Sequence, residues 1–350
     1  MRELQFSAMV NQFQPGIFTA LNDKKEEMIQ AGKRVFNLSV GTPDFAPAPH
    51  VMEALTEACK DPENYKYALA DLPELLEAVQ YRYAHRFGVE IQTDEIMSVY
   101  GSQEGMAHIG MALCDPGDTI LVPNPGYPLF EMSGIMAGAN VEYYEIREEN
   151  GYLPDLKNIP GEVLERTKYM VVSYPLNPVC VCAPDHFYEE LIAFAKEHHI
   201  VIIHDNAYSD IIFTREQGRS FLSFDGAKEV GVEFYSLSKS YNLTGARISF
   251  VVGNKAIERS LKRCVLRLIM ASFCRFRRLR SRRLRGRTIS SKSRGRSMQK
   301  ETVRCAAVCE GSGGMYRTVR GQCLCGQRFR KAMRRPLISV CSLWKRPDFW

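Results

Sequence analysis

Residues 236–247 read SLSKSYNLTGAR, and this stretch decides both the fold and the chemistry that we expect of the chain. Lys239 stands among serine hydroxyls, and Arg247 follows eight residues later. A lysine amine can form a Schiff base with a carbonyl, while hydroxyls, backbone N–H groups and an arginine can hold a phosphate dianion. Pyridoxal phosphate carries both groups. A surface lysine in a Ser-rich loop would give the same letters, so the other motifs must decide between the two interpretations.

Composition divides the 350-residue chain into two unlike parts. Residues 1–263 hold 23 Lys and Arg against 37 Asp and Glu, a net charge of −14, whereas residues 264–350 hold 23 against 3, a net charge of +20. Four of the 11 cysteines precede this boundary and seven follow it. The length suits two domains or one large α/β unit. The two parts therefore need different explanations.

The first part has the features of an ordinary cytosolic enzyme. Its four cysteines are scattered, as in proteins of a reducing compartment. The opening residues MRELQF lack the apolar segment that follows a basic start in a secretory signal, and no apolar run reaches membrane-spanning length. We expect a cytoplasmic location.

Expected strands and helices alternate along the first part. We expect helices at 18–31, from Pro73, at 106–113 and at about 184–197, a short strand from Val35, and further strands at 96–100, 119–122, 141–146, 169–173, 200–204, 233–237 and 247–252. Strongly apolar strands that alternate with helices indicate a mostly parallel sheet covered on both faces. In such sheets ligands bind at the carboxyl ends of the strands.

Polar motifs stand at those expected strand ends. Asn177 lies in YPLNP after one strand, and Asp205 and Tyr208 lie in HDNAY at the end of the next. Tyr127 lies in NPGYP after a third strand. Each residue alone has an ordinary structural explanation, because aromatic side chains fill cores and an aspartate can cap a helix. Their joint order and placement favour one ligand site that includes Lys239.

Two turns with glycine add candidate binding groups. Residues 101–105, GSQEG, follow an expected strand and open a helix. Ser102 and Gln103 therefore stand where unpaired N–H groups and the positive end of a helix dipole attract a phosphate. Gly41, in VFNLSVGTPDF, would let the backbone approach a ligand closely, although a plain turn glycine explains it equally well.

From about residue 10 to residue 263 the chain resembles the class I and II aminotransferases of the fold-type I pyridoxal-phosphate family, most closely the branch with diaminopimelate-type and alanine aminotransferases. The ordered set GSQEG, NPGYP, YPLNP, DNAY and SLSKSYNLTGAR carries the resemblance. It implies a three-layer α/β fold, a homodimer, and transfer of an amino group between an amino acid and a 2-oxo acid. It divides the chain into a segment of the small domain at 1–45 and a cofactor-binding large domain at 46–263.

The resemblance also assigns the reacting groups. Lys239 would form the Schiff base with pyridoxal phosphate and then move the substrate proton as general base and acid. Asp205 would face the pyridine nitrogen and keep it protonated, so that the ring accepts electrons. Tyr208 and Asn177 would hydrogen-bond the phenolic oxygen of the ring, and Tyr127 would stack on its face.

By the same resemblance the phosphate would be held by hydroxyls, amides and a guanidinium, those of Ser102, Gln103, Ser236, Ser238 and Arg247. Tyr67 would reach the phosphate bound to the neighbouring subunit. Gly41 and Asn177 would border the substrate. We expect no metal.

The chain departs from the family pattern at two turns. After Asn177 and Pro178 the family usually has Thr-Gly, whereas this chain has Val179-Cys180 and so lacks a small turn glycine. The turn near Leu72 is one residue short of the usual Asp-Gly-Leu-Pro pattern, which is expected to shift the presentation of Tyr67.

The resemblance ends at Cys264, where Arg-rich text such as FRRLRSRRLRGRTISSKSRGR begins. A basic run could be a nucleic-acid arm, and the later cysteines could hold zinc. The spacings in Cys305/Cys309 and Cys323/Cys325, C-x3-C and C-x-C, are poor zinc patterns, and the text lacks amphipathic periodicity. We therefore expect neither partner, and we expect the non-homologous tail at 264–350 to be disordered.

A shift of reading frame explains the tail better. Residues 266–276, LRLIMASFCRF, can be encoded by codons that read SQIDYGIFLPV in a shifted frame, and residues 281–287, SRRLRGR, can yield AALTGP in the same frame. Both new strings resemble the family, so we hypothesise a frame slip near residues 263–265. The small domain would then be incomplete and would lack the family arginine that pairs the substrate α-carboxylate.

Three alternatives stay open at this point. A β-eliminating carbon–sulfur lyase uses the same fold, and a chain without the C-terminal domain could be an inactive pyridoxal-phosphate-binding pseudoenzyme. The fold also serves as a ligand-sensing domain of transcription regulators. No helix-turn-helix pattern precedes the cofactor domain here, which disfavours the regulator.

Overall fold

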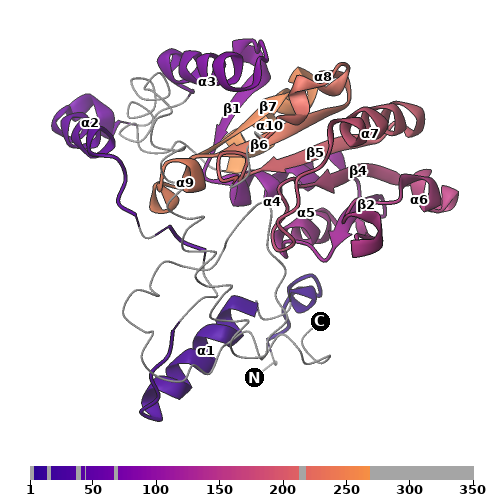
Figure 1. Cartoon of the computed structure of the whole chain (residues 1–350), viewed down its shortest axis with the longest axis horizontal. Helices are drawn as coiled ribbons and strands as arrows, with labels where there is room; N and C mark the ends of the chain where they lie inside the picture. Colours follow the sequence, from indigo (N-terminus) through magenta and orange to yellow (C-terminus); the bar gives the residue numbers. More distant parts are fainter. Residues whose placement is uncertain are drawn as a thin grey trace.

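The computed structural model describes residues 4–13, 17–36, 41–43, 45–66, 70–212 and 218–268. Its centre is a seven-stranded sheet in the order β1-β7-β6-β5-β4-β2-β3 (Figure 1). β7 runs antiparallel to β1 and β6, and the other neighbouring pairs are parallel. The mostly parallel sheet expected from the sequence is confirmed. The strands are β1 (Ile96–Val99), β2 (Thr119–Asn124), β3 (Asn140–Glu145), β4 (Thr167–Val172), β5 (Val201–Asn206), β6 (Gly231–Ser236) and β7 (Ser249–Gly253).

Helices cover both faces of this sheet. In Figure 1, α3, α7 and α8 lie on one side and α4 and α5 on the other, so the sheet is the middle layer of three. The central strands are apolar on both faces, and all of β6, GVEFYS, is buried. The helices are α1 (Ile17–Gln30), α2 (Pro49–Lys60), α3 (Pro73–Phe87), α4 (Ser102–Leu113), α5 (Leu129–Ala137), α6 (Gly161–Leu164), α7 (Asp185–His198), α8 (Ala227–Val230), α9 (Leu237–Ser240) and α10 (Lys255–Leu268).

Close helix packing fixes the layer that holds α4. A Cβ on Gly110 of α4 would lie 2.2 Å from the carbonyl oxygen of Ser133 in α5, so only a glycine permits this approach. α10 also packs on α4, where the hydroxyl of Ser260 donates to the carbonyl oxygen of Ala112 at 3.0 Å. The C-terminal turn of α4 is thereby held between α5 and α10.

Two expected strand positions are corrected by the structure. Val35 and Phe36 form no strand, and the rest of that expected strand, residues 37–40, lies outside the described residues. The strand expected at 247–252 begins only at Ser249, because Arg247 has a left-handed backbone with φ of 48°, which a strand does not accommodate.

The expected boundary between domain and tail falls inside a helix. α10 runs without interruption from Lys255 to Leu268, across residue 263. The expectations for residues 269–350 lie outside the described residues. None of the described helices is long and apolar enough to cross a membrane.

Candidate active site

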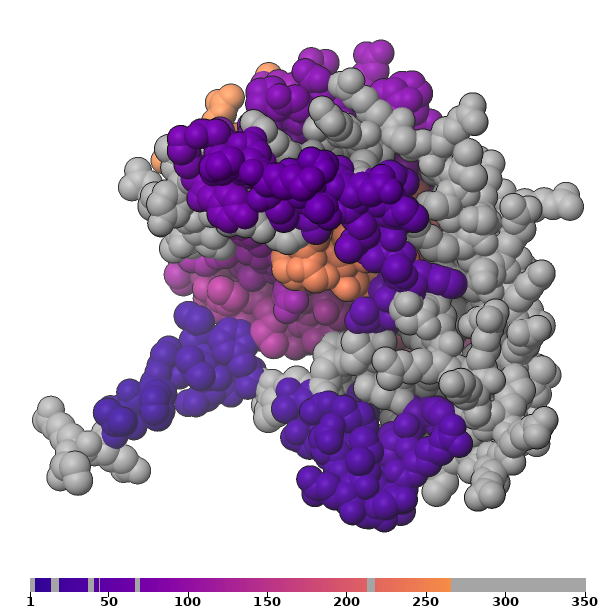
Figure 2. All heavy atoms as spheres, turned by 90° about the vertical axis from the view of Figure 1, so that its left-hand side faces the viewer, coloured from indigo at the N-terminus to yellow at the C-terminus, as the bar shows by residue number. Residues whose placement is uncertain are grey.

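The carboxyl ends of three neighbouring strands bring the site together. β4 leads to Asn177, β5 carries Asp205, and β6 ends at Ser236, three residues before Lys239. Because these strands are adjacent and parallel, the segments that follow them leave the sheet at one edge. Figure 2 shows orange atoms, from the last part of the described chain, within an indentation bordered by violet atoms of N-terminal residues.

Lys239 lies in the one-turn helix α9 directly after β6. The hydroxyl of Ser236 caps this turn by accepting from the Ser238 N–H at 3.1 Å. The Lys239 ammonium donates to the Gly41 carbonyl oxygen at 2.6 Å, which brings Gly41 from the distant N-terminal segment to the site. Burial, with a further contribution from Arg247, lowers the pKa of Lys239. A lowered pKa increases the share of neutral, nucleophilic amine.

Asp205 presents a carboxylate oxygen that has no hydrogen-bond partner in the described part of the chain. Its Oδ1 is buried and accepts no hydrogen bond from the described residues. Burial raises the pKa of Asp205 to about 6, with His204 opposing the rise and Glu233 adding to it. Buried carboxylate oxygens almost always have a partner. The open position at Oδ1 therefore suits a cationic N–H donor supplied by a ligand.

Two tyrosines lie within electrostatic reach of this carboxylate, and Asn177 hydrogen-bonds one of them. Burial raises the pKa of Tyr208, Asp205 and Tyr127 raise it further, and a side-chain hydrogen bond with Asn177 opposes the rise. Burial likewise raises the pKa of Tyr127, with Asp205 adding to it and Arg247 opposing it. Tyr127 thus lies within electrostatic reach of both the carboxylate and the guanidinium. The expected cluster of aromatic and polar groups is present at the strand ends.

The N-terminus of α4 and Arg247 form a second, cationic end of the site. A Cβ on Gly101, which has φ of 87°, would lie 2.3 Å from Arg247 Nη2, so the guanidinium rests directly on the turn before α4. Among the described residues, no side chain caps α4 at Gly101. Ser102 donates to the Ser249 hydroxyl at 3.1 Å, and Gln103 is exposed. Uncapped N–H groups beside a guanidinium are suited to a phosphate.

These groups fit pyridoxal phosphate. Lys239 offers an amine of lowered pKa for the aldehyde, and Asp205 offers the pyridinium N–H an oxygen to which no described residue donates. Arg247 and the start of α4 offer a phosphate cradle that a side chain at Gly101 would fill. The described residues include no group of three or more His, Cys, Asp and Glu side chains that could hold a metal ion.

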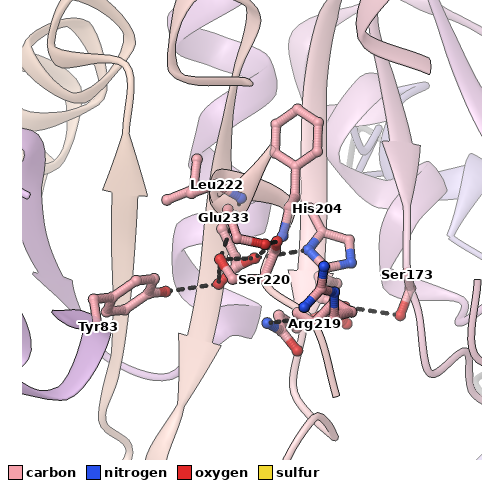
Figure 3. Close-up of polar contacts among 11 residues, drawn as sticks. Tyr83, Ser173, His204, Arg219, Ser220, Leu222 and Glu233 are labelled. Carbon is pink, nitrogen blue, oxygen red and sulfur yellow. Dashed lines mark hydrogen bonds and ion pairs between the residues drawn. The ribbon is translucent and has the colours of Figure 1, made fainter. Parts of the chain in front are cut away.

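A buried network around Glu233 was not anticipated from the sequence (Figure 3). Glu233 of β6 accepts from Tyr83 Oη at 2.8 Å, from the Phe221 N–H at 2.8 Å and from the Ser220 hydroxyl at 2.9 Å, and it pairs with His204 Nδ1 at 2.9 Å. The signal was available, because a glutamate stands in the apolar strand GVEFYS and a histidine in VIIHD. Charged side chains in fully apolar strands indicate buried, paired groups.

This network and its surroundings fix the end of β5 at three successive residues. His204 is tied to Glu233 at 2.9 Å, the Asp205 carbonyl oxygen accepts from Ser173 Oγ at 3.0 Å, and the Asn206 amide donates to the Arg219 carbonyl oxygen at 3.2 Å. Asp205 therefore projects from a backbone that cannot easily shift.

The remaining expectations about the site have mixed outcomes. Tyr67 lies outside the described residues, so its role stays a prediction. Cys180 has φ of 62°, in the left-handed region, and its N–H donates to the Leu176 carbonyl oxygen at 2.5 Å. This is the position at which the family usually has glycine, and the turn keeps the glycine-like conformation with a buried cysteine in place.

Fold and site together define a pyridoxal-phosphate enzyme built on a mostly parallel, doubly covered sheet. The chain belongs to the class I and II aminotransferase family, whose profile matches residues 33–274. Members of this family depend on pyridoxal phosphate and transfer amino groups between amino acids and 2-oxo acids.

The relatives agree with this assignment. The chain is 39% identical over 262 residues to the LL-diaminopimelate aminotransferase of Dehalococcoides mccartyi, over 74% of this chain and 68% of the relative. It is 40% identical over 245 residues to that of Syntrophobacter fumaroxidans, over 69% of this chain and 63% of the relative. The chain therefore spans only about two thirds of the length of these relatives.

Solved structures share the fold. A substrate-bound structure of BacF from Bacillus subtilis has a TM-score of 0.87 and 34% identity, and covers 91% of this chain and 82% of that chain. A probable N-succinyldiaminopimelate aminotransferase from Thermus thermophilus has a TM-score of 0.79 and 30% identity, and covers 85% and 80% of the two chains.

Proposed function

We propose that this chain binds pyridoxal phosphate at Lys239 and transfers an amino group between an amino acid and a 2-oxo acid. The observation that carries the proposal is the pairing of an amine of lowered pKa, Lys239, with a buried carboxylate oxygen of Asp205 that has no partner among the described residues. When bound, the cofactor would supply an electron sink for the substrate Cα–H bond. Everything else in the reaction is binding, orientation and proton transfer by side chains.

Lys239 is the proposed proton carrier. A lysine whose pKa is lowered by burial can take a proton from a substrate carbon and return it to a neighbouring atom. The Gly41 carbonyl oxygen lies 2.6 Å from Nζ. It would accept a hydrogen bond from the Lys239 amine when that amine is not bound to the cofactor. We also propose that Gly41, with Asn177, borders the substrate.

Asp205 and its neighbours are proposed to hold the cofactor ring. A cationic N–H at Oδ1 would favour the ionised carboxylate and offset the rise that burial imposes on its pKa. Tyr208 and Asn177, which share a hydrogen bond, would together hold the phenolic oxygen. Tyr127 would cover the ring face, near both Asp205 and Arg247.

The phosphate is proposed to lie between Arg247 and the start of α4. The close approach of the guanidinium to Gly101 supports this position. Hydroxyl and amide donors would come from Ser102, Gln103, Ser236 and Ser238, with Tyr67 of a second copy completing the cradle in a homodimer.

LL-Diaminopimelate is the proposed amino donor, because the relatives with 39% and 40% identity carry that name. The chain would act in the cytoplasm. We further propose that the domains divide as 1–45, 46–263 and 264–350, and that the reading frame slips near codon 264. The family profile ends at residue 274, within the basic part, which supports a change in this region. Sequencing the locus tests the slip, and an uninterrupted gene without a family-like second frame contradicts it.

A half-reaction tests the function. The purified 350-residue chain, supplied with pyridoxal phosphate and LL-diaminopimelate, should convert the cofactor to pyridoxamine phosphate and release a 2-oxo acid. Lys239→Ala should abolish this conversion, whereas the matched lysine variant Lys228→Ala, in α8, should retain it. Release of pyruvate and ammonia from a cysteine conjugate would identify a carbon–sulfur lyase instead. Cofactor binding without any turnover would identify an inactive relative.

A further inference from the structure

Asp210 is a buried carboxylate two residues after Tyr208, and it receives two arginines from α3. Arg82 Nη2 lies 2.5 Å from Asp210 Oδ2, and Arg86 Nε lies 3.2 Å from Oδ1. The side chains of Asp210 and Arg82 are only 3% and 8% exposed. Burial opposes ionisation of Asp210, but the two arginines outweigh it and hold the pKa of the carboxyl below its usual value. The Asp210 carboxylate therefore stays ionised, and the two arginines hold it in position.

The same carboxylate is tied to the strand and the turn that carry Lys239. Tyr235, the residue before Ser236 in β6, donates its hydroxyl to Asp210 Oδ2 at 2.8 Å. Ser240, directly after Lys239, also stabilises the ionised carboxylate. Asp210 thus connects the segment that follows Tyr208 with the segment that surrounds Lys239.

Arg82 and Arg86, both in α3, contact the same two segments. The Arg82 guanidinium lies over the ring of Tyr235 at 5.5 Å and over that of Tyr241, two residues after Lys239, at 5.9 Å. Arg86 Nη2 donates to the Ser209 carbonyl oxygen at 3.2 Å. One face of α3 therefore contacts the backbone or side chains on both sides of the site.

The separation of these two segments is not set by the sheet. Pairing between β5 and β6 ends at Asn206 opposite Tyr235, so strand hydrogen bonds do not reach Tyr208 or Lys239. Beyond that point no pairing between β5 and β6 fixes how far the lysine lies from the tyrosine, and side-chain contacts between the two segments are able to set this distance. A displacement of about 1 Å in a reacting group can lower a rate about a hundredfold.

We propose that Asp210 and Arg82 are positioning residues, which set the distance between Lys239 and Tyr208 by clamping the segments after β5 and β6 to α3. The proposal rests on the proposed function, because it concerns the alignment of that site. Neither residue needs to touch cofactor or substrate to act in this way. A buried ion pair suits the task, since its geometry is narrow and any shift would uncover an unpaired charge.

Tyr235→Phe and Asp210→Asn test the proposal in the full chain. Tyr235→Phe is the milder change, because it removes one donor to Asp210 and leaves the ring beneath Arg82. The matched control is Glu57→Gln, which breaks the exposed ion pair with Lys60 in α2, 2.7 Å long and outside the Asp210 contacts. Two readouts are measured: amide hydrogen exchange in the cofactor-free protein, and the pH midpoint of the visible absorbance of bound cofactor.

Exchange should rise about tenfold at 207–212 and 239–243 in both site variants, and not in the control, because only these segments lose their clamp. The pH midpoint should shift by about half a unit or more in both site variants, since alignment of Lys239 with its neighbours controls it. A uniform rise in exchange, or an unchanged midpoint, would show that the network only stabilises the fold and would overturn the proposal. If the wild-type chain binds no cofactor, the proposed function fails, and the exchange pattern still decides whether the clamp exists.

Discussion

The guanidinium of Arg247 rests directly on Gly101. A Cβ at residue 101 would lie 2.3 Å from Nη2 and 2.8 Å from Cζ, distances that real Cβ contacts do not reach. The two residues are far apart in sequence and belong to the two parts of the proposed phosphate cradle. Gly101 has a φ of 87°, which L side chains rarely adopt, and this backbone lets the guanidinium lie against the turn that starts α4.

Gly101→Ala should therefore weaken cofactor binding by at least about tenfold, because the methyl group displaces Arg247 and a tenfold loss corresponds to only about 1.4 kcal/mol. Titration of the purified protein with pyridoxal phosphate measures it. Gly117→Ala is the matched control, since Gly117 has a similar φ of 91° and a Cβ there would meet nothing within 4 Å. Both variants should lose about 1 kcal/mol of stability from backbone strain. Equal loss of cofactor affinity in both would contradict the contact.

Asp205→Asn should stabilise the cofactor-free protein at neutral pH. The pKa of Asp205 is raised from 3.8 to about 6, so the native state binds the proton more tightly than the unfolded chain does. Stability of the wild type should then fall as pH rises from about 4 to about 6, by on the order of 1–3 kcal/mol, and stay low above that window. The asparagine variant lacks this slope.

Urea unfolding across this pH range, with cofactor absent, compares the two proteins. With cofactor bound the order should reverse, because only the carboxylate pairs with a cationic N–H. If the free energy of unfolding depends on pH in the same way in wild type and variant, the pKa of Asp205 is not raised by folding.

Much of this site could be anticipated from local sequence, and some of it could not. The alternation of apolar strands and helices placed Asn177, Asp205 and Lys239 at neighbouring strand ends, because the carboxyl ends of parallel strands meet at one edge. The left-handed turn at Cys180 also corresponds to a departure visible in the letters VC after Asn177-Pro178.

Contacts that depend on how distant segments pack together could not be predicted from the local sequence. The bond from Lys239 to Gly41 joins residues 198 apart, and nothing in either segment alone indicates it. The contact between Gly101 and Arg247 also depends on tertiary register, although the family resemblance had assigned Arg247 and the neighbouring Ser102 to one phosphate site. The sequence predicted that β7 begins at residue 247, whereas it begins at Ser249. The apolar pattern of ARISFVV does not reveal the left-handed conformation of Arg247.

Glu233→Gln should destabilise the protein by about 3 kcal/mol, because an amide in place of a buried carboxylate leaves some of its donors without an acceptor. Tyr83, Ser220, Phe221 and His204 all contact this carboxylate. Glu229→Gln is the control, since its ion pair with Lys196 is exposed, with 69% of the Glu229 side chain accessible, and should contribute less than about 0.5 kcal/mol. Urea midpoints measure the stability of both variants. Similar small losses of stability in Glu233→Gln and Glu229→Gln would contradict a stabilising role of the Glu233 network.

Cys180→Gly should be more stable than Cys180→Ala by about 1 kcal/mol, because both lose the thiol and only glycine adopts φ of 62° without strain. Thermal unfolding of the two variants measures the difference. The control pair is Glu190→Gly and Glu190→Ala, at an exposed position within α7. Here the glycine variant should be the less stable one, because glycine destabilises a helix relative to alanine. An alanine variant at 180 as stable as the glycine variant would mean that the turn relaxes.

The most direct measurement of the central claim is the site of covalent attachment. The full chain is incubated with pyridoxal phosphate, reduced with borohydride and digested, and the modified peptide is identified by mass spectrometry. The amine of lowered pKa predicts one label at Lys239, lost in Lys239→Arg and kept in Lys228→Arg. A label spread over several lysines, or one that persists in Lys239→Arg, would contradict the assignment of the site.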